Sequence, residues 1–332
     1  MANNYNVDIL KKLRLDVWHD LGYDGSIGLS ATAEGLVVNN LTDGWWSSPY
    51  PREGSDHALK TALVFHVFAP GRKLVSLPGT NANNSDGLYF ASHSANYILN
   101  HGIDTFFRSL NGDADGMDNY LSNLPFLTYI NSGGNGGEHS YNTAPRNKYI
   151  YGVGAIRLNM EMPASWSSHS PYIDFAMPDG VYIPATDGKT WYPFNGTSCA
   201  APALAGMCAC INHFFLVKRA KPLKREKMYE FLKDCSKDIW DKGKDNKTGW
   251  GLPILPHPDS IDIDKYAPFG DDDNMIFSDT KNHWNKDHIN AVTNIGLMQG
   301  YPDGTFKPDK PLTRAEAVEI LYNIYVEGKN GE

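Results

Sequence analysis

One run in the second half of the chain combines a hydroxyl nucleophile with a stretch of small residues. Segment 195–206 reads NGTSCAAPALAG, so Ser198 follows a glycine turn. We expect a tight turn that opens a closely packed helix, with Pro202 tolerated because it lies in the first turn. Backbone N–H groups there could stabilise an oxyanion after attack by Ser198. The Gly-Thr-Ser tripeptide alone, however, more often marks an N-cap.

The full segment resembles the serine signature of the subtilisin-like peptidases, Gly-Thr-Ser-x-Ala-x-Pro followed by a helix of small residues. The resemblance implies an α/β fold, a three-layer sandwich around a mostly parallel sheet. It also implies a serine endopeptidase that hydrolyses protein or peptide substrates through an acyl-enzyme at Ser198. No cofactor is required for that catalysis. Calcium often stabilises the family as a structural ion, but no ligand set for it is traceable in the sequence.

A second match to the family concerns the oxyanion. Segment 132–137, SGGNGG, follows an apolar run and resembles the family's Ala-Gly-Asn segment, whose Asn side chain donates to the oxyanion. Asn135 is thereby implied as a donor beside the Ser198 backbone, with Gly133 and Gly134 next to the substrate. An asparagine between glycines is otherwise an ordinary turn residue.

Substrate binding is implied for segment 108–112, RSLNG, which resembles the Ser-Leu-Gly edge strand of the family. Ser109, Leu110, Asn111 and Gly112 would pair with the substrate backbone in the manner of an added strand. Asn111 replaces the expected glycine, so the shape of the substrate pocket departs from the family pattern.

A serine nucleophile needs a histidine to accept its proton and a carboxylate to orient that histidine. His57 opens a predicted helix that ends before an Ala-Pro-Gly turn, an order that resembles the family's catalytic histidine segment. Ala58 and Leu59 replace the Gly-Thr of that segment. We predict His57 as the general base and interpret His66 and His101 as core or surface residues.

The orienting acid departs furthest from the family pattern. The family places an aspartate after an apolar strand, whereas the corresponding stretch 28–33 is followed by Glu34. We predict Glu34 as the acid, since either carboxylate accepts from the ring N–H, although its extra methylene alters the geometry. Asp43 is the alternative, and Asp56 is expected to be an N-cap. A second hypothesis is therefore a peptidase-like protein, catalytically impaired, that binds or assembles on a cell surface or phage particle.

Short apolar runs alternate with glycine turns from residue 6 to residue 255, which favours a layered α/β architecture. Strands are predicted at 29–33, 73–78, 105–109, 126–130 and 149–155, with crossover helices at 94–102 and 116–122. We assign residues 1–257 to the peptidase domain. The proline-rich and then acidic stretch 258–274 is typical of a linker.

Residues 275–327 form a second predicted unit, a small α-helical module with a capping box in which Thr313 precedes Glu316 by three residues. Its pattern, including GYPDGTFKP at 300–308, resembles an S-layer homology (SLH) motif. The resemblance implies binding of anionic cell-wall polysaccharide through Trp284, Arg314 and Glu316. Such motifs typically occur in threes and this sequence holds one, so our hypothesis is a homotrimer joined through this module.

Composition excludes some partners. Lys and Arg number 30 against 38 Asp and Glu, and the net charge of −8 disfavours nucleic acid. No stretch reaches the roughly 20 apolar residues of a membrane span, and no export signal is visible. The SLH resemblance still implies a cell-surface or extracellular location, with a phage particle or the cytoplasm as alternatives. The cysteines are expected to be buried free thiols; they are Cys199, Cys208, Cys210 and Cys235.

Overall fold

A computed structural model gives the fold. It describes residues 2–34, 46–47, 55–77, 95–110, 118–139, 145–185, 187, 189–268, 277–280, 282–294, 298, 300–301 and 303–329. Three residues singled out from the sequence lie outside the described residues: the alternative acid Asp43, and Asn111 and Gly112 of the predicted substrate strand.

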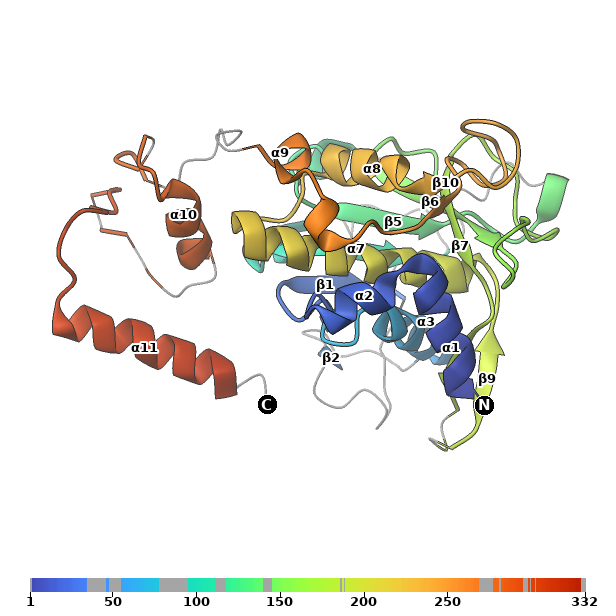
Figure 1. Ribbon diagram of the computed structural model, residues 1–332, viewed down its shortest axis with the longest axis horizontal. Coiled ribbons are helices and arrows are strands. Elements are labelled where there is room, and N and C mark those ends of the chain that lie inside the picture. The colour runs from blue at the N-terminus through green and yellow to red at the C-terminus, as the bar shows by residue number, and fades with distance from the viewer. Residues whose placement is uncertain are drawn as a thin grey trace.

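Seven strands form a central sheet in the order β2-β3-β1-β4-β5-β6-β7, and every neighbouring pair is parallel (Figure 1). The strands are β1 (Leu29–Thr32), β2 (Trp46–Ser47), β3 (Lys73–Ser76), β4 (Ile103–Arg108), β5 (Thr128–Ser132), β6 (Ile150–Ile156) and β7 (Ile173–Pro178). Strands β4, β5 and β6 are buried along their whole length, as expected for strands inside a parallel sheet that is covered on both faces. The predicted α/β fold with a mostly parallel sheet is confirmed.

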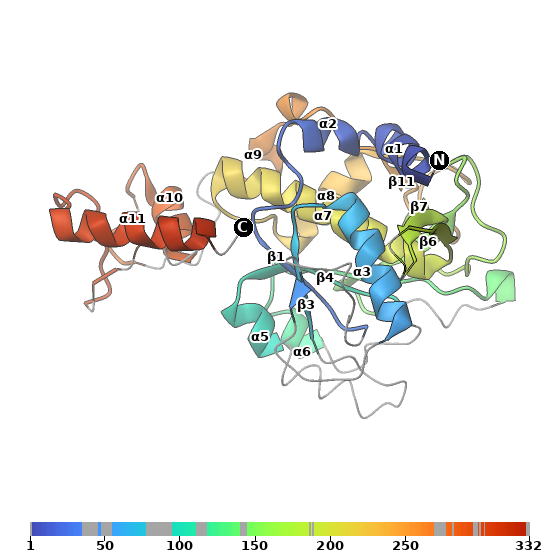
Figure 2. The same cartoon turned by 90° about the horizontal axis from the view of Figure 1, so that it is seen from below.

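Helices cover both faces of this sheet (Figure 2). One face packs against α1 (Ala2–Leu13), α2 (Leu15–Asp20), α3 (Asp56–Phe68), α7 (Thr197–Arg219) and α8 (Arg225–Asp234). The opposite face packs against α5 (Ala95–Asn100) and α6 (Asp118–Leu121), which lie within the two predicted crossover segments. Neighbours in β4 show the division, because Phe107 belongs to the first core and Phe106 to the second.

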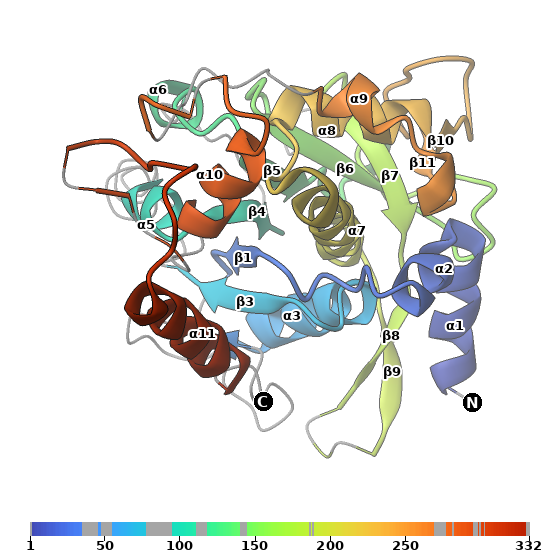
Figure 3. The same cartoon turned by 60° about the vertical axis from the view of Figure 1, so that its left-hand side comes forward.

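Helix α7 runs through the centre of the larger core (Figure 3). By length and composition it is the one described helix that could cross a membrane, but 89% of its apolar window is buried inside the domain. Gly206 brings it against α3, since an added Cβ there would lie 2.5 Å from the Cβ of Phe68. The expectation of free thiols holds for all four cysteines, of which three are buried and Cys235 is half-buried.

Smaller elements complete the domain. They are a hairpin of β8 (Val181–Pro184) and β9 (Trp191–Phe194), the pair β10 (Ser236–Lys237) and β11 (Leu252–Pro253), the 3₁₀ turns Gly137–His139 and Pro258–Ser260, and α9 (Ile263–Tyr266). Helix α9 packs on the core, with the rings of Phe231 and Tyr266 5.0 Å apart. Arg219 Nε also donates to the Ala267 carbonyl at 3.0 Å. The first domain therefore extends beyond residue 257, and the expected linker 258–274 starts too early.

The carboxy-terminal unit consists of α10 (Lys286–Asn294) and α11 (Arg314–Lys329) joined by turns. Its small core includes Phe277, whose ring lies 5.2 Å from that of Phe306. Gly300 approaches the Phe277 ring so closely that a Cβ would collide with it. The predicted capping box is present: the Glu316 N–H donates to Thr313 Oγ1 at 3.2 Å, and the Thr313 N–H donates to Glu316 Oε2 at 2.8 Å.

Candidate active site

The structure places Ser198 in the first turn of α7, directly after the turn at Gly196. Gly196 has φ 99° and ψ 168°, a combination that favours glycine. A Cβ on Gly196 would also lie 3.4 Å from the Asn135 side-chain nitrogen. The Ser198 side chain is half-buried, and the helix N-terminus gives it a positive local field. These features fit a nucleophile exposed at a sharp turn.

The next residue does not compete with Ser198 as a nucleophile. Cys199 is fully buried, and burial raises the pKa of its thiol to about 12. A protonated thiol away from solvent is inert. Ser198 is therefore the candidate nucleophile of this turn.

Pro202 is expected from the sequence in the first turn of α7. It lies in the second turn instead, because the helix begins at Thr197. A residue there would normally donate its N–H to the Ser198 carbonyl, four positions back, and proline lacks that N–H. The Ser109 hydroxyl donates to the Ser198 carbonyl instead, at 3.2 Å. The missing helix bond is thus replaced by a contact from the strand segment predicted to bind substrate.

Glu34 and His57 lie in contact, although they come from separate elements. Glu34 follows β1, and His57 is the second residue of α3. His57 Nδ1 lies 2.9 Å from Glu34 Oε2, with the Glu34 side chain fully buried and 38% of the His57 side chain exposed. Glu34 Oε2 accepts no hydrogen bond of good geometry. The two atoms are therefore at hydrogen-bonding distance, but the ring N–H of His57 does not point at Oε2. Catalytic hydrogen bonds are often unaligned before substrate binds.

The other Glu34 oxygen is fixed by the backbone. The Ser109 N–H donates to Glu34 Oε1, which holds the carboxylate at the carboxyl ends of β1 and β4. The N-cap of α3 is Ser55, whose hydroxyl accepts from the Ala58 N–H at 3.3 Å. The expectation of Asp56 as N-cap is wrong; Asp56 is the first helical residue and pairs with Lys60.

The Ser198 hydroxyl donates to the Ser109 carbonyl at 3.3 Å. Within the described residues, no hydrogen bond joins Ser198 to His57. The ring of His57 instead lies 6.1 Å from that of Phe194, edge-on, at the end of β9. A proton transfer from Ser198 to His57 would therefore require the Ser198 side chain to rotate away from Ser109.

Asn135 lies beside the turn that carries Ser198. Its Oδ1 accepts from the Thr197 N–H at 2.9 Å and from the Thr197 hydroxyl at 3.0 Å. A backbone N–H must face an oxygen, so these contacts fix the amide orientation and direct Nδ2 away from Thr197. The residue is solvent-exposed, which leaves Nδ2 available to a substrate oxygen.

Two glycines hold this loop against the sheet. The Gly134 N–H donates to Thr197 Oγ1 at 3.1 Å, and the Gly133 N–H donates to the Val153 carbonyl at 2.8 Å. A Cβ at Gly133 would lie 2.4 Å from Ile173 Cδ1. Ser109 and Leu110 follow β4 on the same sheet edge, so the structure brings together the described members of the predicted site.

A buried cation near Glu34 is not predicted from the sequence. Arg108, the last residue of β4, is buried, and its Nη1 donates to the Tyr129 hydroxyl at 3.3 Å. Burial lowers the pKa of Arg108, but Tyr129 and the Glu34 carboxylate outweigh this, so its net shift is upward. An arginine at a strand end usually reaches solvent, so no sequence signal marks this one.

Metal-binding groups do not gather at this site. Across the residues that the structure describes, no three or more His, Cys, Asp or Glu side chains are placed to hold an ion. The structural calcium ion common in the resembled family thus has no candidate ligand set in the described part of the chain.

Comparison with known proteins gives the family of the first domain. The profile of the subtilase family matches residues 48–251, more than half of the chain. The chain belongs to the subtilase family. The match includes His57, Asn135 and Ser198 but begins after Glu34, so the acid lies outside the part that the profile covers.

Several known proteins are similar to this subtilase. A thermostable alkaline protease of Halalkalibacterium halodurans is 26% identical over 166 residues, which is 48% of this chain and 45% of that protein. A lanthipeptide protease structure has a TM-score of 0.57 at 17% identity, covering 69% of this chain and 86% of that one. The structure of MycP1 from Mycobacterium smegmatis has a TM-score of 0.55 at 16% identity, covering 74% of this chain and 82% of that one. These solved structures support the fold alone.

The carboxy-terminal unit matches the S-layer homology domain over residues 276–318. A cellulosome-anchoring protein of Acetivibrio thermocellus is 46% identical over 56 residues, which is 17% of this chain and 12% of that protein. A cell surface glycoprotein of the same organism is 41% identical over 55 residues, 17% of this chain and 2% of that protein. The chain thus spans less than half the length of these curated relatives.

The predicted glycan residues of the SLH module differ in environment. Trp284 is 86% exposed, and Arg314 is exposed at the start of α11. The Glu316 carboxylate accepts from Thr313, and these bonds lower its pKa. A cavity of about 530 Å³ lies nearby in the module, and none of the three lines it. Its lining residues are Ser278, Asp279, Asn282, His283, Lys307, Pro308, Asp309 and Lys310.

Proposed function

We propose that this chain is a serine endopeptidase that hydrolyses peptide bonds through an acyl-enzyme at Ser198. His57 acts as general base and then general acid, and Glu34 orients it. The observation that carries the proposal is the 2.9 Å contact between His57 Nδ1 and a fully buried Glu34 carboxylate. A buried carboxylate at that ring nitrogen holds the other one, Nε2, in the acceptor state that a general base needs.

The reaction begins when a substrate strand pairs with residues 109–110 and its carbonyl carbon reaches Ser198. His57 Nε2 takes the hydroxyl proton as Oγ attacks, and the imidazolium that forms is stabilised by Glu34. The oxyanion receives hydrogen bonds from the Ser198 N–H and from Asn135 Nδ2. The C–N bond breaks as His57 returns the proton to the leaving amine. Water then attacks the acyl-enzyme by the same route and releases Ser198.

A second candidate function is a peptidase-like protein that binds or assembles without turnover. Two observations favour it: the Ser198 hydroxyl is bonded to the Ser109 carbonyl, and Glu34 Oε2 lacks a well-aligned donor. An unaligned triad is a poor catalyst, because loss of the acid alone costs on the order of 10⁴ in turnover. This candidate protein would act on a cell surface or phage particle.

Labelling with a fluorophosphonate probe separates the two candidates. We expect the folded wild-type protein to be labelled and Ser198→Ala to be unlabelled, because the probe traps an activated serine. Glu34→Ala should label far more slowly. A folded wild-type protein that takes up no probe would overturn the peptidase. Undiminished labelling of Glu34→Ala would remove Glu34 from the triad.

We further propose that the SLH module anchors the peptidase at a cell surface by binding anionic cell-wall polysaccharide. The similarity to a cellulosome-anchoring protein supports this role. Trp284 and Arg314 are exposed enough to meet a glycan, and Lys307 and Lys310 supply positive charge in the adjacent cavity. Glu316 contributes by holding the first turn of α11, since its carboxylate is bonded to Thr313.

We also propose that three copies associate through this module. The module leaves several large apolar side chains more than half exposed. They are Leu312, Val318, Leu321 and Tyr322. Light scattering of the purified chain should give a trimer mass, and Leu321→Glu should reduce it to the monomer. A monomer at micromolar concentration would contradict this association and leave the peptidase proposal intact.

A further inference from the structure

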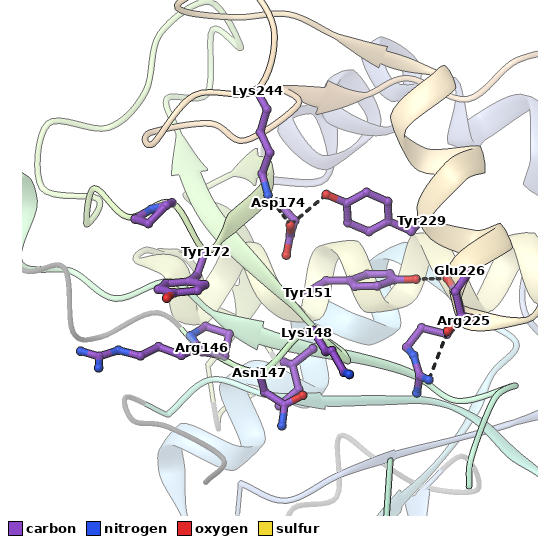
Figure 4. A pocket seen from close by; sticks show the side chains of 13 residues that line it. Arg146, Asn147, Lys148, Tyr151, Tyr172, Asp174, Arg225, Glu226, Tyr229 and Lys244 are labelled. Carbon is purple, nitrogen blue, oxygen red and sulfur yellow. Dashed lines mark hydrogen bonds and ion pairs between the residues drawn. The ribbon is translucent and has the colours of Figure 1, made fainter. Parts of the chain in front are cut away.

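A second pocket lies on the opposite edge of the sheet from Ser198. It is formed at the amino-terminal ends of β6 and β7, where residues 145–151 and 171–174 meet the first turn of α8 (Figure 4). The candidate active site, in contrast, is built at the carboxyl ends of β1, β4 and β5. The cavity measures about 400 Å³, within the roughly 300–1,000 Å³ of ligand sites. It therefore has room for a small ligand or a few residues of peptide.

The base of this pocket is rigid. One oxygen of Asp174 accepts from Lys244 Nζ and from the Tyr229 hydroxyl, each at 2.9 Å. The other oxygen accepts from the Gly152 N–H at 3.0 Å. Trp250 Nε1 in turn donates to the Tyr229 hydroxyl at 3.0 Å. These contacts fix the carboxylate and the neighbouring ring before any ligand arrives.

Basic side chains surround the pocket from three segments, in a protein whose net charge is −8. Arg225 is buried and structural, since its Nη1 donates to the carbonyls of Leu121 and Leu124 at 3.0 and 3.3 Å. Arg146 and Lys148 are exposed on the loop before β6, where Lys148 Nζ lies 4.9 Å from the centre of the Tyr149 ring. In Figure 4, this loop and Lys244 lie on different sides of Asp174. The two loop cations are therefore placed to meet a negatively charged ligand.

Aromatic rings supply the apolar surface. The Tyr151 ring is buried beneath the pocket, its hydroxyl bonded to the Arg225 carbonyl, and lies 5.3 Å edge-on from the Tyr229 ring. Tyr172 is 42% exposed on the opposite side. A small inorganic anion has no surface to cover these rings. The ligand must combine negative charge with an aromatic or apolar group.

The two acidic side chains of the lining restrict the ligand class further. Asp174 and Glu226 would repel the dense charge of a nucleotide phosphate. A peptide differs, because its N–H groups can donate to these carboxylates while its own acidic side chains meet Arg146 and Lys148. We propose that this pocket binds a short acidic peptide segment that carries an aromatic residue. Because this pocket lies on the opposite edge of the sheet from Ser198, the segment can bind there whether or not a substrate occupies the candidate active site. The pocket would therefore recognise a part of a protein ligand that does not reach Ser198.

Fluorescence anisotropy of full-length Ser198→Ala protein tests the proposal without turnover. The probe is a labelled pentapeptide of Asp, Glu and one central Tyr, compared with the same peptide carrying Lys in place of each acid. We expect saturable binding of the acidic peptide that weakens as salt rises, and none of the basic one. The combined change Arg146→Ala with Lys148→Ala should weaken binding about tenfold, which corresponds to about 1.4 kcal/mol for the loss of two exposed charge contacts.

The matched control is Lys11→Ala with Lys12→Ala, which removes the same charge from the exposed surface of α1, outside the pocket. Control binding should equal that of the parent, and Tyr172→Ala should weaken binding, because the aromatic residue of the ligand covers this exposed ring. Equal binding of both peptides, or equal loss in the control, would overturn the site. Unlabelled acidic peptide and adenosine monophosphate are each tested for displacement of the labelled peptide. Displacement by both at the same concentration would overturn the assignment of a peptide ligand. Because Ser198 is absent throughout, failure here leaves the peptidase proposal untouched.

Discussion

At the scale of single residues, Ser109 connects the parts of the candidate active site. Its N–H holds Glu34, its carbonyl accepts from the Ser198 hydroxyl, and its hydroxyl donates to the Ser198 carbonyl. A substrate strand that paired with residues 109–110 would compete for the Ser109 carbonyl. Loss of that bond would release the Ser198 hydroxyl toward His57. Substrate binding and activation of the nucleophile are thereby coupled in our account.

Arg108 gives a test of the electrostatics behind Glu34. Arg108 is buried and is attracted to the Glu34 carboxylate, so its charge helps to hold that carboxylate in place beside His57. Arg108→Met should therefore slow the fluorophosphonate labelling of Ser198 several-fold. Arg108→Lys keeps the charge and should be labelled at close to the wild-type rate. The measurement is the labelling rate of each variant at pH 8.

A structural role for Arg108 alone predicts another result. In that case Arg108→Lys would be labelled as slowly as Arg108→Met, because a lysine restores the charge but not the packing of the guanidinium group. Circular dichroism of each variant confirms that the proteins compared are folded.

The sequence predicts the residues of this site better than their contacts. Ser198, His57 and Asn135 stand in local patterns, so their types and neighbours identify them. The contact of Glu34 with His57 joins two separate elements, and no spacing in the chain shows it. Pro202 is a similar case. The Ser109 hydroxyl replaces its missing hydrogen bond, and Ser109 lies 93 positions earlier in the chain, directly after β4.

At the scale of elements, the packing of α3 on α7 holds together the two helices that carry His57 and Ser198. Gly206 permits this contact, because a Cβ there would lie 2.5 Å from Phe68 Cβ and 2.9 Å from the Phe65 carbonyl oxygen. Helix propensity favours Gly206→Ala by up to about 1 kcal/mol. Overpacking against a backbone atom costs about 1–3 kcal/mol, which exceeds this gain in helix propensity.

Gly206→Ala should therefore lower the free energy of unfolding by about 1–2 kcal/mol and slow Ser198 labelling as α3 moves outward. Val217→Ala, a change at an exposed position of the same helix, is the control and should stay within about 0.5 kcal/mol of wild type. Urea unfolding and labelling rates measure both effects. A Gly206→Ala protein more stable than wild type would contradict the packing argument.

The predicted strands follow from short, largely apolar runs, and β1, β3, β4, β5 and β6 are confirmed with ends that differ by up to two residues from the predicted ones. The sequence does not predict β7. Its apolar run is interrupted by Asp174 and closed by Pro178, residues that ordinarily disfavour strands. Asp174 is accommodated because Lys244, Tyr229 and Gly152 satisfy its oxygens, a tertiary arrangement that local sequence cannot reveal.

At the scale of the whole molecule, three buried or half-buried histidines tie the stability of the peptidase domain to pH. Burial lowers the pKa of His19, His66 and His213 below the ordinary 6.5. Their folded-state pKa values are depressed, so the unfolded chain takes up more protons as the pH falls. The stabilisation is present above about pH 6.5 and is lost as the pH falls through the folded-state values.

Urea unfolding at pH 8 and pH 5 should show a lower free energy of unfolding at pH 5. His213→Gln should reduce this difference, because one depressed histidine is removed. Carboxylates titrate mostly below pH 5, so they contribute little to the difference between these two measurements. Equal stability at the two pH values would contradict the account, as would a His213→Gln protein with an unchanged pH dependence.

The two-module organisation follows from the sequence because each module carries its own local pattern. The boundary between them does not, since Pro258 to Ala267 has the composition of a linker yet packs on the first core. The second pocket is equally hidden in the sequence. Its lining comes from four segments that the fold alone brings together, residues 145–151, 171–174 and 225–229 and Lys244.

The most direct test of the central claim is detection of the acyl-enzyme. The wild-type protein is mixed with p-nitrophenyl acetate, nitrophenolate release is followed on the millisecond scale, and the acetylated peptide is located by mass spectrometry. Our account predicts a burst of nitrophenolate close to one per chain, with the acetyl group on Ser198. It also predicts a burst rate slowed on the order of 10⁴ in Glu34→Gln. A folded wild-type protein with no burst, or with the acetyl group on another residue, would contradict it.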